Sequence, residues 1–181
     1  MRLMPTVLLC VIIGLTAEIT VAQTPAGQEL QIYVVDVEGG GATLVVSPSG
    51  ESLLIDTGNG GDAAPRDAGR IMEAINDAGL DHLDHLIITH YHGDHFGGAA
   101  TLATMIPIKN LYDNGLFDGM PNQPDKSYLE LKCDKRTVIK PGDRIELNQG
   151  DKKQQLSLLC LGTRQQLEAL AEMVHATKSP L

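Results

Sequence analysis

Apolar and polar residues alternate over short distances between residues 30 and 56, and turn residues interrupt the alternation twice. Runs rich in Ile, Val, Leu and Tyr predict three strands, over 30–37, 43–46 and 52–55. Gly39-Gly40-Gly41 supplies the first turn, and Ser47-Pro48-Ser49-Gly50 supplies the second. Residues 30–56 are therefore expected to form a β-meander.

Beyond residue 56, stretches with apolar residues at helical spacing alternate with short apolar runs that are typical of strands. Apolar residues at helical spacing predict a helix over 66–78, with Gly79 at its C-terminal end. Shorter helices are expected over 99–105, 126–133 and 164–176. Strands are expected over 86–89 and 108–112, on both sides of a turn at 141–143, and over 155–161. Residues 56–65 and 90–98 are predicted to be loops. This mixture predicts an α/β (α+β) fold class.

The first 22 residues have the layout of a secretory signal peptide. Arg2 precedes the apolar run 7–15, and Thr20-Val21-Ala22 offers small residues before a cleavage site at Gln23. We therefore expect export to the periplasm or the extracellular space, with 23–29 as a linker. No membrane span is expected after cleavage. A buried core helix or a retained membrane anchor is the alternative interpretation of residues 1–22.

The composition disfavours nucleic-acid binding. The 181-residue chain, long enough for one medium domain, has 14 Lys and Arg against 23 Asp and Glu, for a net charge of −9, and it has no Trp. An acidic surface repels phosphate backbones, and few aromatic rings are available to stack on bases. No stable nucleic-acid binding is therefore expected. After signal cleavage two cysteines would remain, Cys133 and Cys160, which could pair or stay buried as thiols.

One short segment carries the candidate chemistry. Residues 90–95 read His-Tyr-His-Gly-Asp-His, which places four potential metal ligands within six positions. In an extended backbone His90 and His92 point to the same side. Gly93 then lets the chain turn, so that Asp94 and His95 can face a second metal position, about 3.5–4 Å from the first in binuclear hydrolytic sites. A solvated histidine-rich loop is the alternative.

Three segments resemble a known family. Thr89 to Gly98, read with its His-x-His-x-Asp-His core, resembles the signature of the metallo-β-lactamase-fold superfamily. Leu54-Ile55-Asp56-Thr57-Gly58 resembles the first motif of that superfamily. Residues 32–44 are similar to the start of secreted domains related to the competence protein ComEC. The resemblance extends over about residues 30–147.

The resemblance implies a fold and a set of site residues. The fold would be a four-layer αββα sandwich with metal at the open edge between its two sheets. His90 and His92 would bind the first ion, and Asp94 and His95 the second. Asp94 would also hold and deprotonate the attacking water, and Asp56 would orient the ligand loop. The expected cofactor is one or two Zn²⁺ ions, with iron or manganese as alternatives.

The function implied is that of an exported metal-dependent hydrolase that activates water. A small-molecule substrate is expected, either a phosphodiester or an ester- or amide-type compound, and no serine or cysteine nucleophile is needed. A mononuclear iron oxygenase of the same fold is one alternative. An inactive half-domain, or a protein that only binds, is another.

The chain departs from the family after about residue 147. Members of the superfamily complete the site with ligands from the second half of the fold, whereas here only His175 follows the loop among histidines. Asp113 follows a predicted strand and could approach the site, although most loop aspartates form turns. We therefore expect residues 30–160 to be a partial domain, and 161–181 a divergent helix and tail of a truncated or frame-shifted product. Weak metal binding and a dimer through an exposed sheet face would follow.

Overall fold

The computed structural model describes residues 29–148 and 156–163. The predicted signal peptide at 1–22, nearly all of the linker at 23–29 and the predicted helix at 164–176, with His175, lie outside the described residues. Within the described ranges, no helix is both long enough and apolar enough to cross a bilayer.

Six strands form one mixed sheet in sequence order. They are β1 (Gln31–Val34), β2 (Thr43–Val46), β3 (Ser52–Ile55), β4 (Leu83–Ile87), β5 (Ile108–Asp113) and β6 (Lys135–Val138). The first three pair antiparallel, which confirms the predicted meander, and β3 to β6 pair parallel. Parallel neighbours need crossover connections, and the helices between these strands provide them.

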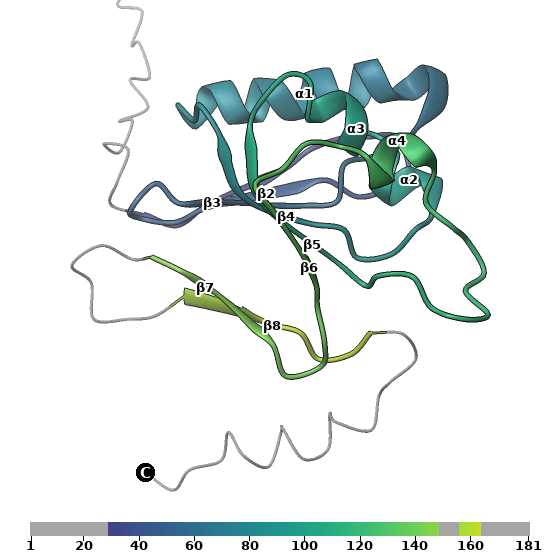
Figure 1. The fold of residues 1–181 in the computed structure, drawn as a ribbon. Coiled ribbons are helices and arrows are strands. Elements are labelled where there is room, and N and C mark those ends of the chain that lie inside the picture. The colour runs from purple at the N-terminus through teal and green to yellow at the C-terminus, as the bar shows by residue number, and fades with distance from the viewer. Residues whose placement is uncertain (1–28, 149–155, 164–181) are drawn as a thin grey trace, which may run out of the picture.

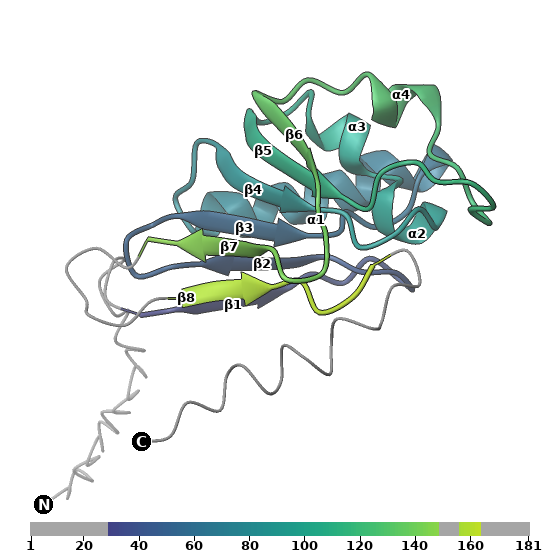
Figure 2. The ribbon, with the colours of Figure 1, turned by 60° about the horizontal axis from the view of Figure 1, so that its bottom comes forward.

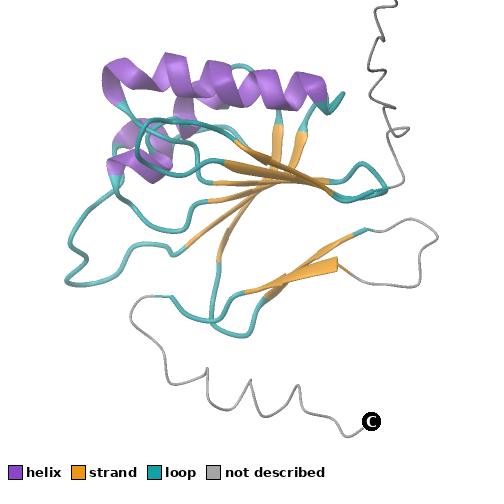
Figure 3. Ribbon diagram, turned by 180° about the vertical axis from the view of Figure 1, so that it is seen from behind, coloured by secondary structure: helices purple, strands orange, loops and turns teal. Residues whose placement is uncertain are grey.

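The helices cover one face of this sheet (Figures 1 and 3). A 3₁₀ turn (Gly61–Ala63) leads into α1 (Ala64–Asp77), and α2 (Gly93–Phe96), α3 (Ala99–Leu102) and α4 (Lys126–Leu129) are single turns. Leu44, Leu54, Leu86 and Leu111 stand in one row across β2 to β5, and none is exposed. Ile71 and Ile75 of α1 are equally buried in the same apolar cluster. Burying this row against α1 supplies the main hydrophobic stabilisation of the sheet.

A second, two-stranded sheet lies against the opposite face (Figures 1 and 2). It consists of β7 (Arg144–Leu147) and β8 (Leu156–Leu159), which pair antiparallel, and Ile145 and Leu147 are buried. Ser49 in the β2–β3 turn donates a hydrogen bond to the carbonyl oxygen of Asn148 at 2.5 Å. The described chain thus has a helical layer, a six-stranded sheet and part of a second sheet. This mixed α/β arrangement is consistent with part of the metallo-β-lactamase fold.

Several predicted elements have different bounds. The strand predicted at 86–89 is β4 at 83–87, because Leu83 and His85 pair with β5, and residues 93–96 form α2 where a loop was expected. The helix predicted from 66 begins at Ala64, since Pro65 suits a first helical turn. The helices predicted over 99–105 and 126–133 are only four residues long.

The turn at 141–143 is present, but its flanking strands do not pair with each other. Asp143 donates its backbone N–H to the carbonyl of Lys140 at 3.0 Å, which closes the turn. The strand before the turn, β6, belongs to the six-stranded sheet, and the strand after it, β7, belongs to the second. The turn therefore carries the chain from one sheet to the other. Cys133 and Cys160 are both free, partly buried thiols.

Candidate metal centre

Three parallel strands bring distant polar residues to one edge of the sheet. Asp56 directly follows β3, the histidine loop follows β4, and Asp113 is the last residue of β5. The carboxyl ends of parallel strands meet at the same edge, where open α/β sheets place their ligand sites. The candidate site is therefore built from segments almost 60 positions apart in the sequence.

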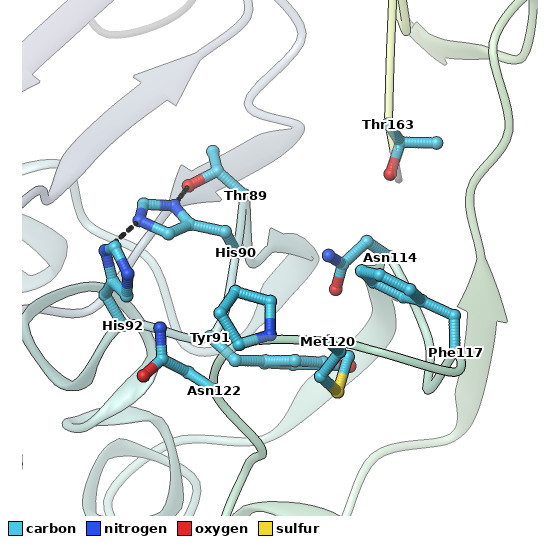
Figure 4. Close-up of a pocket in the computed structure, with 10 residues that line it drawn as sticks. Thr89, His90, Tyr91, His92, Asn114, Phe117, Met120, Asn122 and Thr163 are labelled. Carbon is cyan, nitrogen blue, oxygen red and sulfur yellow. Dashed lines mark hydrogen bonds between the residues drawn. The ribbon is translucent and has the colours of Figure 1, made fainter. Parts of the chain in front are cut away.

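The three histidines of the loop lie against one another. The rings of His90 and His92 have centroids 4.5 Å apart, and those of His90 and His95 are 4.1 Å apart. His90 Nε2 and His92 Nδ1 share a hydrogen bond at 2.9 Å, drawn in Figure 4. A carboxylate oxygen of Asp94 lies 3.9 Å from His95 Nε2. The fold thus gathers all four predicted ligands at one place.

The four side chains are of types that bind metal ions, but their ligand atoms are not arranged around a common ion position. Three imidazoles and a carboxylate are ligands that zinc takes. Within the described part of the chain, no three His, Cys, Asp or Glu groups are arranged so that together they could hold an ion. Two of the nitrogens that an ion would use are instead hydrogen-bonded to each other. The assignment of these residues as metal ligands therefore stays a prediction.

Asp56 fixes the orientation of the loop. Its side chain is almost fully buried, and its backbone φ of 60° is in the left-handed region, which Asp tolerates better than most residues. Thr89 donates both its backbone N–H and its hydroxyl to the Asp56 carboxylate, each at 2.8 Å. The carboxylate also accepts from His95 Nδ1 at 2.7 Å. In the neutral imidazole this leaves the lone pair on Nε2, the atom that faces Asp94.

The backbone of α2 is held by three residues from two segments of the chain. The carbonyl of Gly93 accepts from the N–H of Gly60 at 3.0 Å, and that of Asp94 accepts from Gly41 at 3.3 Å. The carbonyl of His95 accepts from both the N–H and the hydroxyl of Thr57, at 2.7 and 3.0 Å. A four-residue helix leaves its carbonyls without partners of its own, so these contacts complete their hydrogen bonding.

Glycines permit these close contacts. A Cβ atom on Gly40 would overlap the carbonyl oxygen of Asp94, and one on Gly98 would overlap the carbonyl oxygen of Thr57. A Cβ on Gly97 would overlap the backbone of Gly60. The glycines after the histidine loop therefore admit the segment 57–60, which follows β3.

The loop that carries Gly40 and Gly41 is anchored to α1. Arg66 and Arg70 donate to the two carboxylate oxygens of Glu38 at 2.6 and 3.0 Å. Arg66 Nε also donates at 2.7 Å to Asp67, whose side chain is fully buried. Burial raises the pKa of the Asp67 carboxyl, but hydrogen bonds from Arg66 and Asn59 outweigh it, and the net pKa is lowered. Asp67 is thus held as an anion, and it contacts Arg66, which in turn contacts Glu38 in the loop.

Tyr91 anchors the histidine loop on its other side. Its side chain is buried, and its ring packs edge-on against Phe96 and Tyr128, with centroids 5.8 and 5.5 Å away. Tyr128 donates its hydroxyl to the buried carboxylate of Asp113 at 2.8 Å. Burial and the nearby Asp113 charge raise the pKa of both tyrosines, so their hydroxyls stay protonated. In the sequence, the position of Tyr91 between His90 and His92 indicates a side chain on the opposite side of the loop from theirs. Nothing in the sequence indicates the role of Tyr128.

Asp113 does not join the histidines. Its Oδ1 accepts the backbone N–H of Gly115 at 2.9 Å, as a turn-forming aspartate does, and its Oδ2 accepts from Tyr128. The Arg136 guanidinium lies 3.8 Å from Oδ2 and 4.7 Å from the centre of the Tyr128 ring. Asp113 therefore contacts residues that pack behind the histidine loop, and it is not positioned as a metal ligand.

The electrostatics of the cluster favour a neutral His90 ring. Partial burial lowers the pKa of His90, and the neighbouring His95 and His92 imidazoles lower it further. A metal ligand must offer a lone pair, so a lowered pKa leaves more of His90 in the form that can bind.

A pocket of about 220 Å³ opens beside the loop (Figure 4). Its lining includes His90 and His92 and, from the β5–α4 loop, Phe117, Met120 and Pro121. In Figure 4 the imidazoles of His90 and His92 point toward each other on one side of the view, and Phe117 and Met120 lie on the other side. The predicted metal position is thus adjacent to a pocket that is lined by both polar and apolar side chains.

The α/β fold and the polar cluster at the strand ends define a class of protein, and comparison with known families identifies that class. Residues 35–157 match the metallo-beta-lactamase superfamily, and the chain belongs to that family. Members of the family typically bind zinc.

The similar curated proteins are fungal. The lactamase-like protein notP of an Aspergillus species is 42% identical over 65 residues, which are 36% of this chain and 19% of that protein. The atrochrysone carboxyl ACP thioesterase of Aspergillus terreus is 37% identical over the same shares of the two chains. The lactamase-like protein aptB of Emericella nidulans is 26% identical over 122 residues, 62% of this chain and 37% of that protein.

Two points follow from these relatives. The chain spans less than two fifths of the length of each of them. They are lactamase-like proteins and a thioesterase, so they support the superfamily and do not support the ComEC-related type that residues 32–44 suggested.

Proposed function

We propose that this protein is a metal-dependent hydrolase that cleaves thioester or ester bonds of acyl compounds. The observation that carries the proposal is the gathering of three imidazoles and the Asp94 carboxylate at one sheet edge, with His95 held by Asp56. A likeness to an acyl carrier protein thioesterase supports the choice of bond.

The roles of the residues follow from their positions. His90 and His92 would hold one Zn²⁺ ion, and Asp94 and His95 a second, with iron or manganese as alternatives. When bound, zinc supplies Lewis acidity and a water of lowered pKa. Asp94, whose side chain is 44% exposed, is accessible to accept a proton from that water. Asp56 keeps the proton of the His95 ring on Nδ1 and ties the ring to Thr89.

The charge of the site favours a neutral acyl group over a phosphodiester. Among the described residues that line the pocket, none is Lys or Arg. The whole chain has a net charge of −9. A phosphodiester anion would have only the metal ions as cationic partners there, whereas a neutral thioester needs no cationic side chain. Phosphodiester hydrolysis, the other reaction that the sequence left open, is therefore the result that would contradict the proposal.

The test combines metal content with hydrolysis by the full chain. We expect the protein, supplied with zinc in excess, to hydrolyse an N-acetylcysteamine thioester faster than bis(p-nitrophenyl) phosphate or a cephalosporin. His92→Ala should reduce zinc uptake and abolish hydrolysis. His82→Ala is the matched control, because His82 contacts Asp81, Asp84 and Lys109 outside the site. A zinc-loaded chain that hydrolyses none of these would be a binding-only protein. Oxygen consumption with bound iron would establish the oxygenase instead.

We also propose export and self-association, as the sequence predicted. Protein recovered outside the cytoplasm should begin at Gln23, and an intact Met1 there would contradict cleavage. On β1, Ile32 and Val34 are 59% and 83% exposed, which suits a dimer through this sheet. Sedimentation should then show a dimer that Val34→Lys converts to a monomer, and a monomeric wild type would contradict it.

A further inference from the structure

We propose that the pocket beside His90 and His92 binds the apolar acyl group of the substrate, and that Phe117 and Met120 determine which acyl groups fit. The inference rests on the proposed function, because it assigns the part of the substrate that lies next to the bond to be cleaved. No ligand role for the β5–α4 loop, residues 114–125, was expected from the sequence.

Position is the first reason. The pocket shares His90 and His92 with the candidate metal centre, so a group bound in it would have its reactive end beside the predicted ligands. Phe117 and Met120 line the same pocket and lie on the opposite side of the view from these imidazoles (Figure 4). A carbonyl carbon near the histidines would therefore carry its acyl substituent toward the apolar side.

The chemistry of the lining is the second reason. A phenyl ring, a thioether and the rings of Pro121 and Tyr91 form the apolar part of the lining, and Asn114, Asn122, Thr89 and Thr163 add polar groups. Apolar surfaces of this kind gain free energy by releasing water when an apolar group covers them. An apolar cavity of about 150 Å³ is known to bind benzene, so about 220 Å³ is enough for one aromatic ring or an aliphatic group of similar size.

Preorganisation is the third reason. The β5–α4 loop is tied at its start by the bond from Gly115 N–H to Asp113, and at its end by Asp125, which accepts from Tyr128 N–H at 2.8 Å. Met120 packs against the main core, and its N–H donates to the carbonyl of Phe117 at 3.4 Å. A site whose walls are already held in place loses less entropy on binding.

The decisive experiment measures binding without requiring catalysis. The probes are S-phenacyl-N-acetylcysteamine and S-acetonyl-N-acetylcysteamine, two thioethers that cannot be hydrolysed and differ only in phenyl against methyl. Calorimetry on the full chain, with zinc and with EDTA, should show the phenacyl probe binding at least tenfold more tightly. Equal affinity of the wild type for the two probes would overturn the proposal.

Matched variants locate the preference. Met120→Ala should reduce it to threefold or less, whereas Met105→Ala should retain it. Met105 is also a partly exposed methionine, but it lies at another surface cavity. Phe117→Ala should act as Met120→Ala does, and if it does not fold, Met120→Ala decides. A preference unchanged in Met120→Ala would also overturn the proposal.

Failure of this inference can be told from failure of the proposed function. If acetyl and benzoyl thioesters are hydrolysed equally well and the probes bind equally, the hydrolase stands and the acyl pocket is wrong. If neither thioester is hydrolysed but the phenacyl preference persists and depends on Met120, the pocket stands and the hydrolase is wrong.

Discussion

The Nδ1 atom of His95 lies 2.7 Å from the Oδ2 atom of Asp56, although 39 positions separate the two residues. The same carboxylate accepts two hydrogen bonds from Thr89, at the start of the histidine loop. One buried side chain therefore sets both the position of the loop and the tautomer of its last histidine. Mutation of a group that orients a metal ligand in this way typically lowers metal affinity by about tenfold to a hundredfold.

Replacing Asp56 by Asn tests this relationship. Asn has the same shape and tolerates the left-handed backbone, but it removes the negative charge that the His95 N–H contacts. We expect the dissociation constant for zinc to rise by about tenfold to a hundredfold. Competition with a chromophoric chelator measures it. Asp36→Asn, at an exposed carboxylate, should leave the constant unchanged. The interpretation fails if both variants bind zinc like the wild type.

A second prediction concerns the hydroxyl of Tyr128. It donates a hydrogen bond to the carboxylate of Asp113 at 2.8 Å, and both side chains are buried. Tyr128→Phe leaves a buried carboxylate with one donor fewer, so we expect the free energy of unfolding to fall by about 1–3 kcal/mol. Urea unfolding measures the change.

Tyr33 provides the matched control. Its hydroxyl donates to Asp77 at 3.2 Å at an exposed site, where water can replace the lost bond. Tyr33→Phe should change the free energy of unfolding by no more than about 0.5 kcal/mol. If both variants lose the same free energy of unfolding, the buried hydrogen bond does not stabilise the protein more than the exposed one.

The sequence predicted the parts of the site that depend on neighbouring residues. Strands β2 and β3 have the predicted bounds because alternation and turn residues are local signals. His90 and His92 lie on one side of an extended backbone because they are two residues apart. The resemblance also placed Asp56 next to this loop, where the structure has it.

The missed features depend on tertiary contacts. Residues 93–96 were expected to be a loop, and they form α2 because Gly41, Thr57 and Gly60 supply partners for its carbonyls. The support of Tyr91 by Asp113 and Tyr128 joins three segments, and no spacing in the sequence reports it. The same holds for Phe117 and Met120, which line a pocket only because the β5–α4 loop returns toward the histidines.

Two glycine substitutions with opposite expected effects on the free energy of unfolding test the backbone packing at the site. A Cβ on Gly97 would overlap the backbone of Gly60 and Gly93, so Gly97→Ala must displace the loop and should destabilise the protein by about 1–3 kcal/mol. Gly69 lies inside α1 with open space around it, so Gly69→Ala should stabilise by about 0.5–1 kcal/mol. Thermal unfolding distinguishes them. Stabilisation by Gly97→Ala would show that the close contact with Gly60 is absent in solution.

The last prediction concerns acid stability and Asp84 in β4. Burial raises the pKa of this carboxyl, but hydrogen bonds from Lys109, Ser52 and His82 outweigh it and lower the pKa to about 2, from an ordinary value of 3.8. Since the folded-state pKa is the lower one, the charged form stabilises the fold above about pH 4, and this contribution is lost as the pH falls toward about 2. Asp84→Asn should therefore be less stable than the wild type near neutral pH, and the difference should shrink in acid.

Urea midpoints across that pH range measure the effect, and Asp81→Asn is its control. The Asp81 side chain is 93% exposed, so this substitution should give a small difference from the wild type that does not vary with pH. If the difference between Asp84→Asn and the wild type stays constant between about pH 6 and about pH 2, Asp84 does not titrate with the fold. Its contacts with Lys109 and Ser52 would then be absent in solution.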